Sequence, residues 1–130
     1  MIGTLDAFRA YALERGNSAP TDAIDADATA ALVRASDHIR YSYVARFLSG
    51  YDETAANVEP ATYEAALLEL STPGFFSATY TPGERKVLTE VRGIKWQVLD
   101  DGTDGAAPVS TRVEAMLSPY INRVAGAFVV

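Results

Sequence analysis

The stretch from residue 25 to residue 47 reads DADATAALVRASDHIRYSYVARF and contains neither glycine nor proline. Its apolar residues recur every three or four positions, the spacing of one face of an α-helix. This stripe consists of Ala28, Ala31, Leu32, Ala35, Ile39 and Tyr43. Asp25 and Asp27 stand where carboxylates favour the positive end of a helix dipole. The sequence therefore predicts a long central helix with an alanine-rich face that lets a neighbouring helix approach closely.

Shorter helical patterns flank the central one at residues 5–15 and 61–70. Thr4 can cap the first of these helices, and Gly16 can end it. Pro60 suits the first turn of the other helix. The polar residues between the first helix and the central helix predict a loop at 16–22.

The character of the chain changes after residue 85. Residues 86–93 (KVLTEVRG) and 94–100 (IKWQVLD) are rich in β-branched and aromatic residues with partial alternation. This composition is typical of extended segments. Residues 100–107 (DDGTDGAA) predict a loop.

A last helix is predicted at residues 112–121. Thr111 and Glu114 have the spacing of a capping box, and Pro119 is expected to bend or shorten the helix. The fold class is therefore mainly α: a small helical bundle with a short β element between the third and last helices. We expect one helical domain at 1–121, followed by an extended apolar tail at 122–130.

The composition excludes several classes of function. The 130 residues include no cysteine, which excludes disulfides, thiolate metal sites and a cysteine nucleophile. We expect no signal peptide and no membrane span, because no run approaches about 18 apolar residues. The 17 acidic and 11 basic residues give a net charge of −6. This balance argues against tight nucleic-acid binding, which normally needs a basic surface.

Histidine chemistry is the first catalytic possibility. His38 is the single histidine, and catalysis would need a nucleophile such as Ser42, one helical turn later. A zinc site normally takes several His or Cys ligands. We therefore interpret His38 as a polar-face or interface residue, and predict a protein that is not an enzyme and has no cofactor or metal.

The acidic loops offer two further possibilities. Asp52 with Glu53, or Asp100 with Asp101, would be candidates for acid–base work, but polar loops favour solvated surface. The three aspartates among glycines in 100–107 resemble a calcium loop only loosely. The EF-hand spacing and its closing glutamate are missing, so we expect no metal there.

Aromatic and basic residues gather in the second half of the chain. Trp96, Tyr80, Phe75 and Phe76 would suit base stacking, but a core or interface role is favoured because few cations are interleaved. Four cations surround the extended segments: Arg85, Lys86, Arg92 and Lys95. They can pair with acidic residues of a neighbouring subunit or contact nucleic acid.

The order of these segments resembles a known family. The resemblance rests on Ala31–Ile39 (ALVRASDHI), then Arg46-Phe47-x-x-Gly50, then residues 91–96 (VRGIKW) before the final helix. It spans roughly residues 4–121. The pattern is similar to the phage proteins labelled DnaT-like single-stranded DNA-binding proteins, which in turn resemble the head–tail connector (adaptor) proteins of tailed phages and gene transfer agents.

The resemblance implies a structural subunit of the virion neck, assembled in the host cytoplasm. Such subunits form a ring under the portal, commonly of twelve copies, that extends the DNA channel and receives a stopper or tail-completion protein. Double-stranded DNA would pass without specific binding, because an acidic lumen does not hold it. The alternative is a single-stranded DNA-binding replication accessory protein.

The residues add two hypotheses about contacts. In a closed ring, each subunit uses one face against a different face of its neighbour. We expect the contact between subunits to use Arg85, Lys86, Arg92, Lys95 and Trp96. We expect the tail at 122–130 to dock into the portal. Its contact residues would be Arg123, Val124, Phe128, Val129 and Val130.

Overall fold

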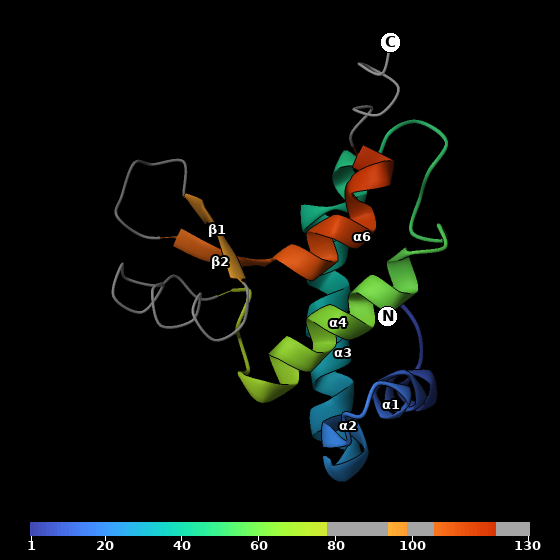
Figure 1. The fold of residues 1–130 in the computed structure, drawn as a ribbon, viewed down its shortest axis with the longest axis vertical. Coiled ribbons are helices and arrows are strands. Elements are labelled where there is room, and N and C mark those ends of the chain that lie inside the picture. Colours follow the sequence, from blue (N-terminus) through green and yellow to red (C-terminus); the bar gives the residue numbers. More distant parts are fainter. Residues whose placement is uncertain (78–93, 99–105, 122–130) are drawn as a thin grey trace.

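The computed structural model describes residues 1–77, 94–98 and 106–121 of the chain. They form a mainly helical fold with one antiparallel β ribbon between the third long helix and the last, as predicted (Figure 1). The elements are α1 (Leu5–Glu14), α2 (Ala19–Asp22), α3 (Asp25–Ser42), the 3₁₀ turn η1 (Val44–Arg46), α4 (Val58–Ser71), β1 (Ile94–Val98), β2 (Ala106–Ser110) and α6 (Thr111–Ile121). The predicted tail at 122–130 lies outside the described residues.

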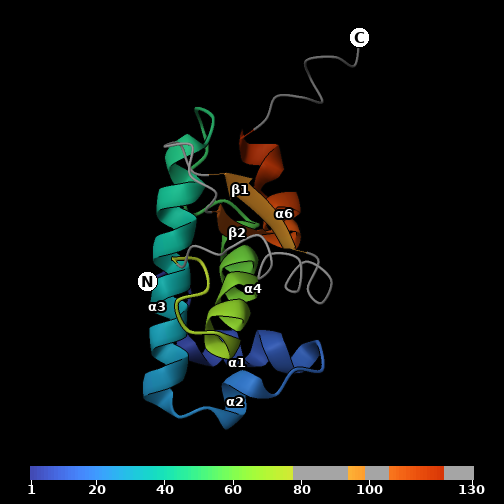
Figure 2. The ribbon, with the colours of Figure 1, turned by 90° about the vertical axis from the view of Figure 1, so that its left-hand side faces the viewer.

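Helix α3 is the scaffold of the fold. Helix α4 packs against it, α1 lies beside its first turns, α2 contacts α1 and α4, and α6 packs against α4 (Figures 1 and 2). The predicted apolar stripe is confirmed, because all of its members are buried. They are Ala28, Ala31, Leu32, Ala35, Ile39 and Tyr43.

The prediction that this helix reaches residue 47 is wrong. Helix α3 ends at Ser42, and the chain continues through η1. Two contacts bend the chain there: the Arg46 side chain donates to the Ser42 carbonyl (2.8 Å), and the Leu48 amide donates to the Tyr120 carbonyl (2.8 Å). The second of these contacts connects the chain after α3 to α6. The composition of this segment does not indicate such a contact.

The first helix is capped as predicted, because the Ala7 amide donates to the Thr4 hydroxyl (3.2 Å). The predicted loop at 16–22 is wrong in part, since α2 forms inside it. Arg9 reaches across from α1 and donates to the carbonyls of Pro20 (2.8 Å) and Ala23 (2.9 Å). These bonds satisfy carbonyl groups at the C-terminal end of the short helix.

Helix α4 is buried on most of its surface. It begins at Val58, before the predicted start, with Pro60 in its first turn. Its buried residues are Val58, Ala61, Thr62, Tyr63, Ala65, Ala66 and Glu69. The alanines allow close packing, and the buried polar Thr62 donates to the Val58 carbonyl (2.8 Å). Glu69 is the one buried carboxylate among the residues with described side chains.

The β ribbon differs from the prediction in its second strand. The extended structure of β1 agrees with the prediction. β2 pairs with it antiparallel, and its first two residues belong to the predicted loop at 100–107. Trp96 lies opposite Pro108 in this register, and Lys95 lies opposite Val109. The sequence AAPVS has a weak strand preference, and Pro108 is tolerated because a two-stranded ribbon consists of edge strands.

Helix α6 follows directly after β2. Its N-terminal cap is Ser110, whose hydroxyl accepts from the Val113 amide (3.3 Å), rather than the predicted Thr111. The helix reaches Ile121, so Pro119 does not shorten it.

A connecting strap, residues 47–57, ties the end of α6 to the rest of the fold. Asn57 donates its side chain to the Met116 carbonyl (2.9 Å) and its amide to the Tyr120 hydroxyl (3.0 Å). The Leu48 amide adds its bond to the Tyr120 carbonyl at the other end of the strap. Within residues 1–77 and 106–121, no helix is long and apolar enough to cross a membrane.

Candidate functional site

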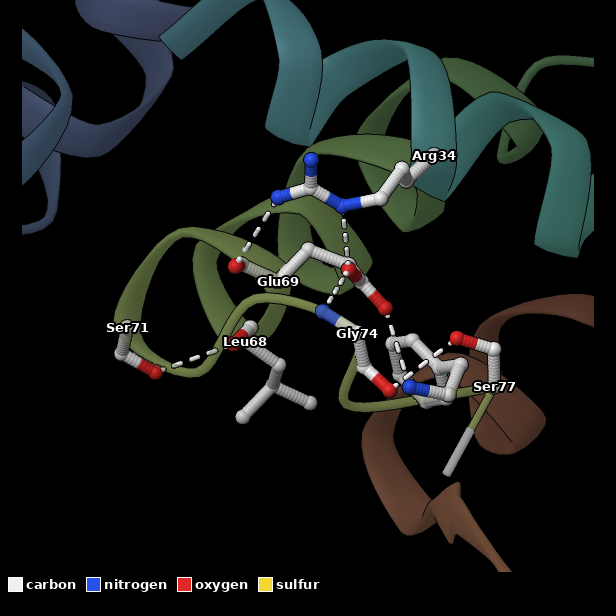
Figure 3. A network of polar contacts seen from close by, with 7 residues as sticks. Arg34, Leu68, Glu69, Ser71, Gly74 and Ser77 are labelled. Atoms are coloured by element: carbon white, nitrogen blue, oxygen red, sulfur yellow. Dashed lines mark hydrogen bonds and ion pairs between the residues drawn. The ribbon is translucent and has the colours of Figure 1, made fainter. Parts of the chain in front are cut away.

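A buried glutamate organises the surface between α3 and the end of α4. The Glu69 side chain is 3% exposed and accepts from the Arg34 Nε (2.8 Å), the Gly74 amide (3.0 Å) and the Phe76 amide (2.9 Å) (Figure 3). A carboxylate so far from water is stable only when its oxygens are paired this fully. Arg34 also donates to the Glu69 carbonyl (3.4 Å), so it closes the last turn of α4.

These bonds fix the turn at residues 72–77. Gly74 has φ +82°, a conformation that other residues rarely adopt. The Ser77 hydroxyl donates to the Gly74 carbonyl (3.2 Å) (Figure 3). The turn directs Phe75 and Phe76 inward, where they are 0% and 9% exposed. The core interpretation of these two aromatic residues is confirmed, and neither ring is available for stacking on bases.

His38 lies under this turn. Its ring stacks on Phe76 with centroids 4.0 Å apart, and meets Tyr43 edge-on. Burial lowers the pKa of His38 to about 4, against a smaller opposing effect of Glu69. His38 is therefore neutral at pH 7. Its Nε2 is buried and has no hydrogen-bond partner.

His38 and Ser42 do not have the geometry of a serine–histidine–aspartate triad. The Ser42 hydroxyl is 3.4 Å from His38 Nδ1, at the limit of a hydrogen bond. In such a triad a carboxylate orients the histidine through its other nitrogen, and here that nitrogen is the unpaired Nε2. The residues that the structure describes also contain no group of three metal-ligating side chains.

Two hollows lie along this side of α3. The larger, about 250 Å³, is lined by Arg34, Asp37, His38, Tyr41, Glu69, Phe76 and Ser77. The other, about 230 Å³, is lined by Asp27, Ala30, Arg34, Leu70 and Pro73. Because Arg34 lines both, we treat them as one surface and call these residues the α3 groove.

Apolar side chains are exposed beside the groove. Val33 and Tyr41 are 41% and 79% exposed, and Asp37 lies between them on the same helical face. Asp27 and Asp37 are exposed and have no hydrogen-bond or ion-pair partner. Asp37 also interacts electrostatically with Arg40, one helical turn later, and helps to raise the pKa of that arginine. The groove therefore combines an apolar edge with two exposed carboxylates.

The arginines are engaged within the molecule. Arg9, Arg34, Arg40 and Arg112 pair with Asp25, Glu69, Glu53 and Glu64, at 2.9, 2.8, 3.0 and 3.8 Å respectively. Arg15 and Arg46 donate to the carbonyls of Tyr11 and Ser42. In the described part of the chain, four arginines thus pair with carboxylates, whereas Arg15 and Arg46 are exposed and bond to backbone carbonyls, which do not neutralise their charge.

No family model, curated protein or solved structure matches this chain.

The predicted contact residues fall mostly outside the described part. Lys95 and Trp96 lie in β1. Arg85, Lys86 and Arg92 lie outside the residues that the structure describes. The predicted tail contacts also lie outside, as do Tyr80, Asp100 and Asp101. The tail contacts are Arg123, Val124, Phe128, Val129 and Val130.

Sequence reasoning missed Glu69, the residue that organises the site. The available signal was a single acid between apolar residues in ALLELSTPGFF, just before a turn. Such a position suits a carboxylate that accepts the amides of the following turn. Its partner Arg34 lies 35 residues away, and no local pattern connects the two.

Proposed function

We propose that this protein is a structural head–tail adaptor subunit. Copies would form a ring under the portal, extend the DNA channel and join the capsid to a stopper or tail-completion protein. The observation that carries the proposal is the distribution of charge: four arginines of the described residues pair with carboxylates, whereas several exposed carboxylates have no hydrogen-bond or ion-pair partner. The free, exposed carboxylates in residues 1–77 include Asp6, Glu14, Asp27 and Asp37.

This distribution suits a channel better than a DNA-binding surface. A tight DNA contact places several cations on phosphates and releases counterions. Free carboxylates on a channel surface would instead repel duplex DNA at short range and leave it free to slide. The net charge of −6 is multiplied by every copy in a ring.

The resemblance to phage adaptors supports the same proposal. The helical order that carries it is present as α1, α3, α4 and α6, with the β ribbon before α6. In the ALVRASDHI motif, the buried members are Ala31, Leu32, Ala35, Ser36 and Ile39. The motif therefore contributes to the packing of α3 in this chain.

The tail at 122–130 is the proposed portal contact. It follows α6 directly and combines Arg123 with an apolar end, AFVV. In this proposal the tail enters apolar pockets of the portal, and the folded domain forms the ring. The virion neck would be the final location, after assembly in the host cytoplasm.

The test is co-sedimentation of the full chain with its cognate portal protein, beside a gel shift on single-stranded DNA at moderate salt. We expect portal binding and no DNA shift. A salt-sensitive shift without portal binding would overturn the proposal in favour of the replication accessory protein. An Arg92→Glu, Lys95→Glu variant would then report whether the basic cluster causes the shift.

A further inference from the structure

We infer that the larger hollow of the α3 groove is a binding site for a small organic amine. The ammonium group of the ligand would pair with Asp37, and its apolar part would lie against His38 and Phe76. Such a site lies outside the proposed function and does not depend on it, because the hollow is formed within one copy of the chain. Its lining comes from α3, from Glu69 of α4 and from the turn after α4.

The hollow has the size and the composition of a site for a small ligand. Its volume is about 250 Å³, just below the range of about 300–1,000 Å³ that small-molecule sites occupy in proteins. The rings of His38, Tyr41 and Phe76 line it together with the exposed carboxylate of Asp37. An apolar wall with a few polar groups is the usual composition of a small-molecule site.

The aromatic wall can accept the apolar part of a ligand without repelling a cation. The rings of His38 and Phe76 stack on each other, and His38 carries no charge at pH 7 because burial lowers its pKa to about 4. Tyr41 is 79% exposed. A ligand that covers the Tyr41 ring removes apolar area from water, and an ammonium group over that ring is attracted to its face.

The uncompensated charge in the hollow is negative. Arg34 and Glu69 neutralise each other through the ion pair between Nε and Oε1 (2.8 Å). Asp37 makes no hydrogen bond or ion pair with the described residues. Arg40 interacts with Asp37 electrostatically, but both oxygens of Glu53 hold its guanidinium group (3.0 and 3.3 Å). Asp37 is therefore able to accept a charge-assisted hydrogen bond from an ammonium group.

The wall of the hollow is formed before a ligand arrives. Glu69 accepts from the amides of Gly74 (3.0 Å) and Phe76 (2.9 Å), which fixes the turn that carries the Phe76 ring (Figure 3). Asp37 and Tyr41 are one helical turn apart and lie on the same face of α3. Because these groups are positioned by the fold, binding a ligand requires little further ordering of the chain.

Backbone-amide NMR shifts of the full chain test the site, because they report which residues the ligand contacts. The probe is 2-phenylethylamine, which joins an aromatic ring to a primary ammonium group. 3-Phenylpropionate keeps the ring and reverses the charge, whereas methylamine keeps the charge and lacks the ring. The titrations are made at pH 7 and about 150 mM salt, which screens the attraction of amines by the net charge of −6.

We expect 2-phenylethylamine to shift the amides of His38, Tyr41 and Ser77 saturably and to bind at least about tenfold more tightly than either comparison probe. Asp37→Asn should weaken this binding at least about fivefold, because it removes the charge. Tyr41→Ser should weaken it about threefold, because it removes an aromatic ring. The matched control is Glu14→Gln, at an exposed carboxylate that lines a different hollow beside α1, and it should change the binding less than about twofold.

Thermal unfolding checks that each variant is folded, and all three substitutions are at exposed positions. Equal binding of 2-phenylethylamine and either comparison probe would overturn the inference. Amide shifts that are absent or do not saturate would also overturn it, as would a folded Asp37→Asn chain that binds the amine as tightly as the unchanged protein. None of these results affects the adaptor proposal, which the co-sedimentation with the portal tests separately.

Discussion

The rings of His38 and Phe76 lie face to face, with centroids 4.0 Å apart and planes inclined by 14°. One ring belongs to α3 and the other to the turn after α4. The turn keeps this position because Glu69 holds the Phe76 amide (2.9 Å). The buried Glu69 carboxylate thus holds the ring that covers the His38 imidazole. Substitution of Glu69 and titration of His38 test this relationship.

The stability of the protein should depend on pH through His38. The pKa of His38 is about 4 in the folded chain and 6.5 when unperturbed. Between these values the unfolded chain binds a proton that the folded chain does not, so the free energy of unfolding falls as the pH falls. The loss is about 3 kcal/mol on going from pH 7 to below pH 4.

Urea unfolding between pH 3.5 and 7 measures this effect, with His38→Phe as the control that removes the titrating group and keeps a ring. We expect the wild-type protein to lose more stability than the variant over this range. Parallel curves for the two proteins would show that the imidazole does not control the pH dependence.

Glu69→Gln should destabilise the fold strongly. The glutamine side chain has no negative charge to pair with Arg34. Its NH₂ group also replaces an oxygen that accepted a hydrogen bond, so two donors would face each other. We expect a loss of about 2–3 kcal/mol in the free energy of unfolding. The matched control is Glu53→Gln, which weakens the exposed pair with Arg40 and should cost below about 1 kcal/mol. Equal costs for the two variants in urea unfolding would contradict this account.

Gly3 and Gly16 provide a matched pair of glycines. Both have φ +78°, but a Cβ at Gly3 would overlap the Tyr63 hydroxyl oxygen, whereas a Cβ at Gly16 meets nothing within 4 Å. Gly16→Ala should cost about 1 kcal/mol from backbone strain alone. Gly3→Ala should cost clearly more, because Tyr63 must move away from its bonds to Glu59 and Thr4. Thermal unfolding of both variants measures the difference, and equal shifts in Tm would refute the steric part.

A chain ending at Ile121 should remain folded and lose portal binding. The described core extends from Ile2 to Ile121, so we expect an unchanged helical circular-dichroism spectrum. Co-sedimentation with the portal should fall to background in the proposed mechanism. Retained binding by the shortened chain would exclude the tail as the portal contact.

Local patterns predicted the parts of the fold that local physics decides. The stripe on α3 follows from helical periodicity, and the Thr4 cap follows from a hydroxyl before a helical run. The ends of α3 and the first residues of α6 were less predictable. Ser110 and Thr111 are both good cap residues, and the pairing of β2 with β1 decides which one lies at the helix start.

The candidate site was predictable only in pieces. His38 and the two phenylalanines drew attention from the sequence, but their stacking depends on a turn held by Glu69. The bond from Arg34 to Glu69 joins two helices 35 residues apart, and pattern reading within one segment does not reach that distance. The α3 groove has the same origin, because its lining comes from α3, α4 and the turn after α4.

The strap at residues 47–57 has a mechanical consequence. Its bonds reach the Met116 carbonyl and both the carbonyl and the hydroxyl of Tyr120, close to the point where the tail leaves α6. A pull on the chain after Ile121 would therefore load these three bonds together, and would not simply unwind the last helical turn from its end. The force would pass through Leu48 and Asn57 into α3 and α4, so the tail is anchored to the whole bundle.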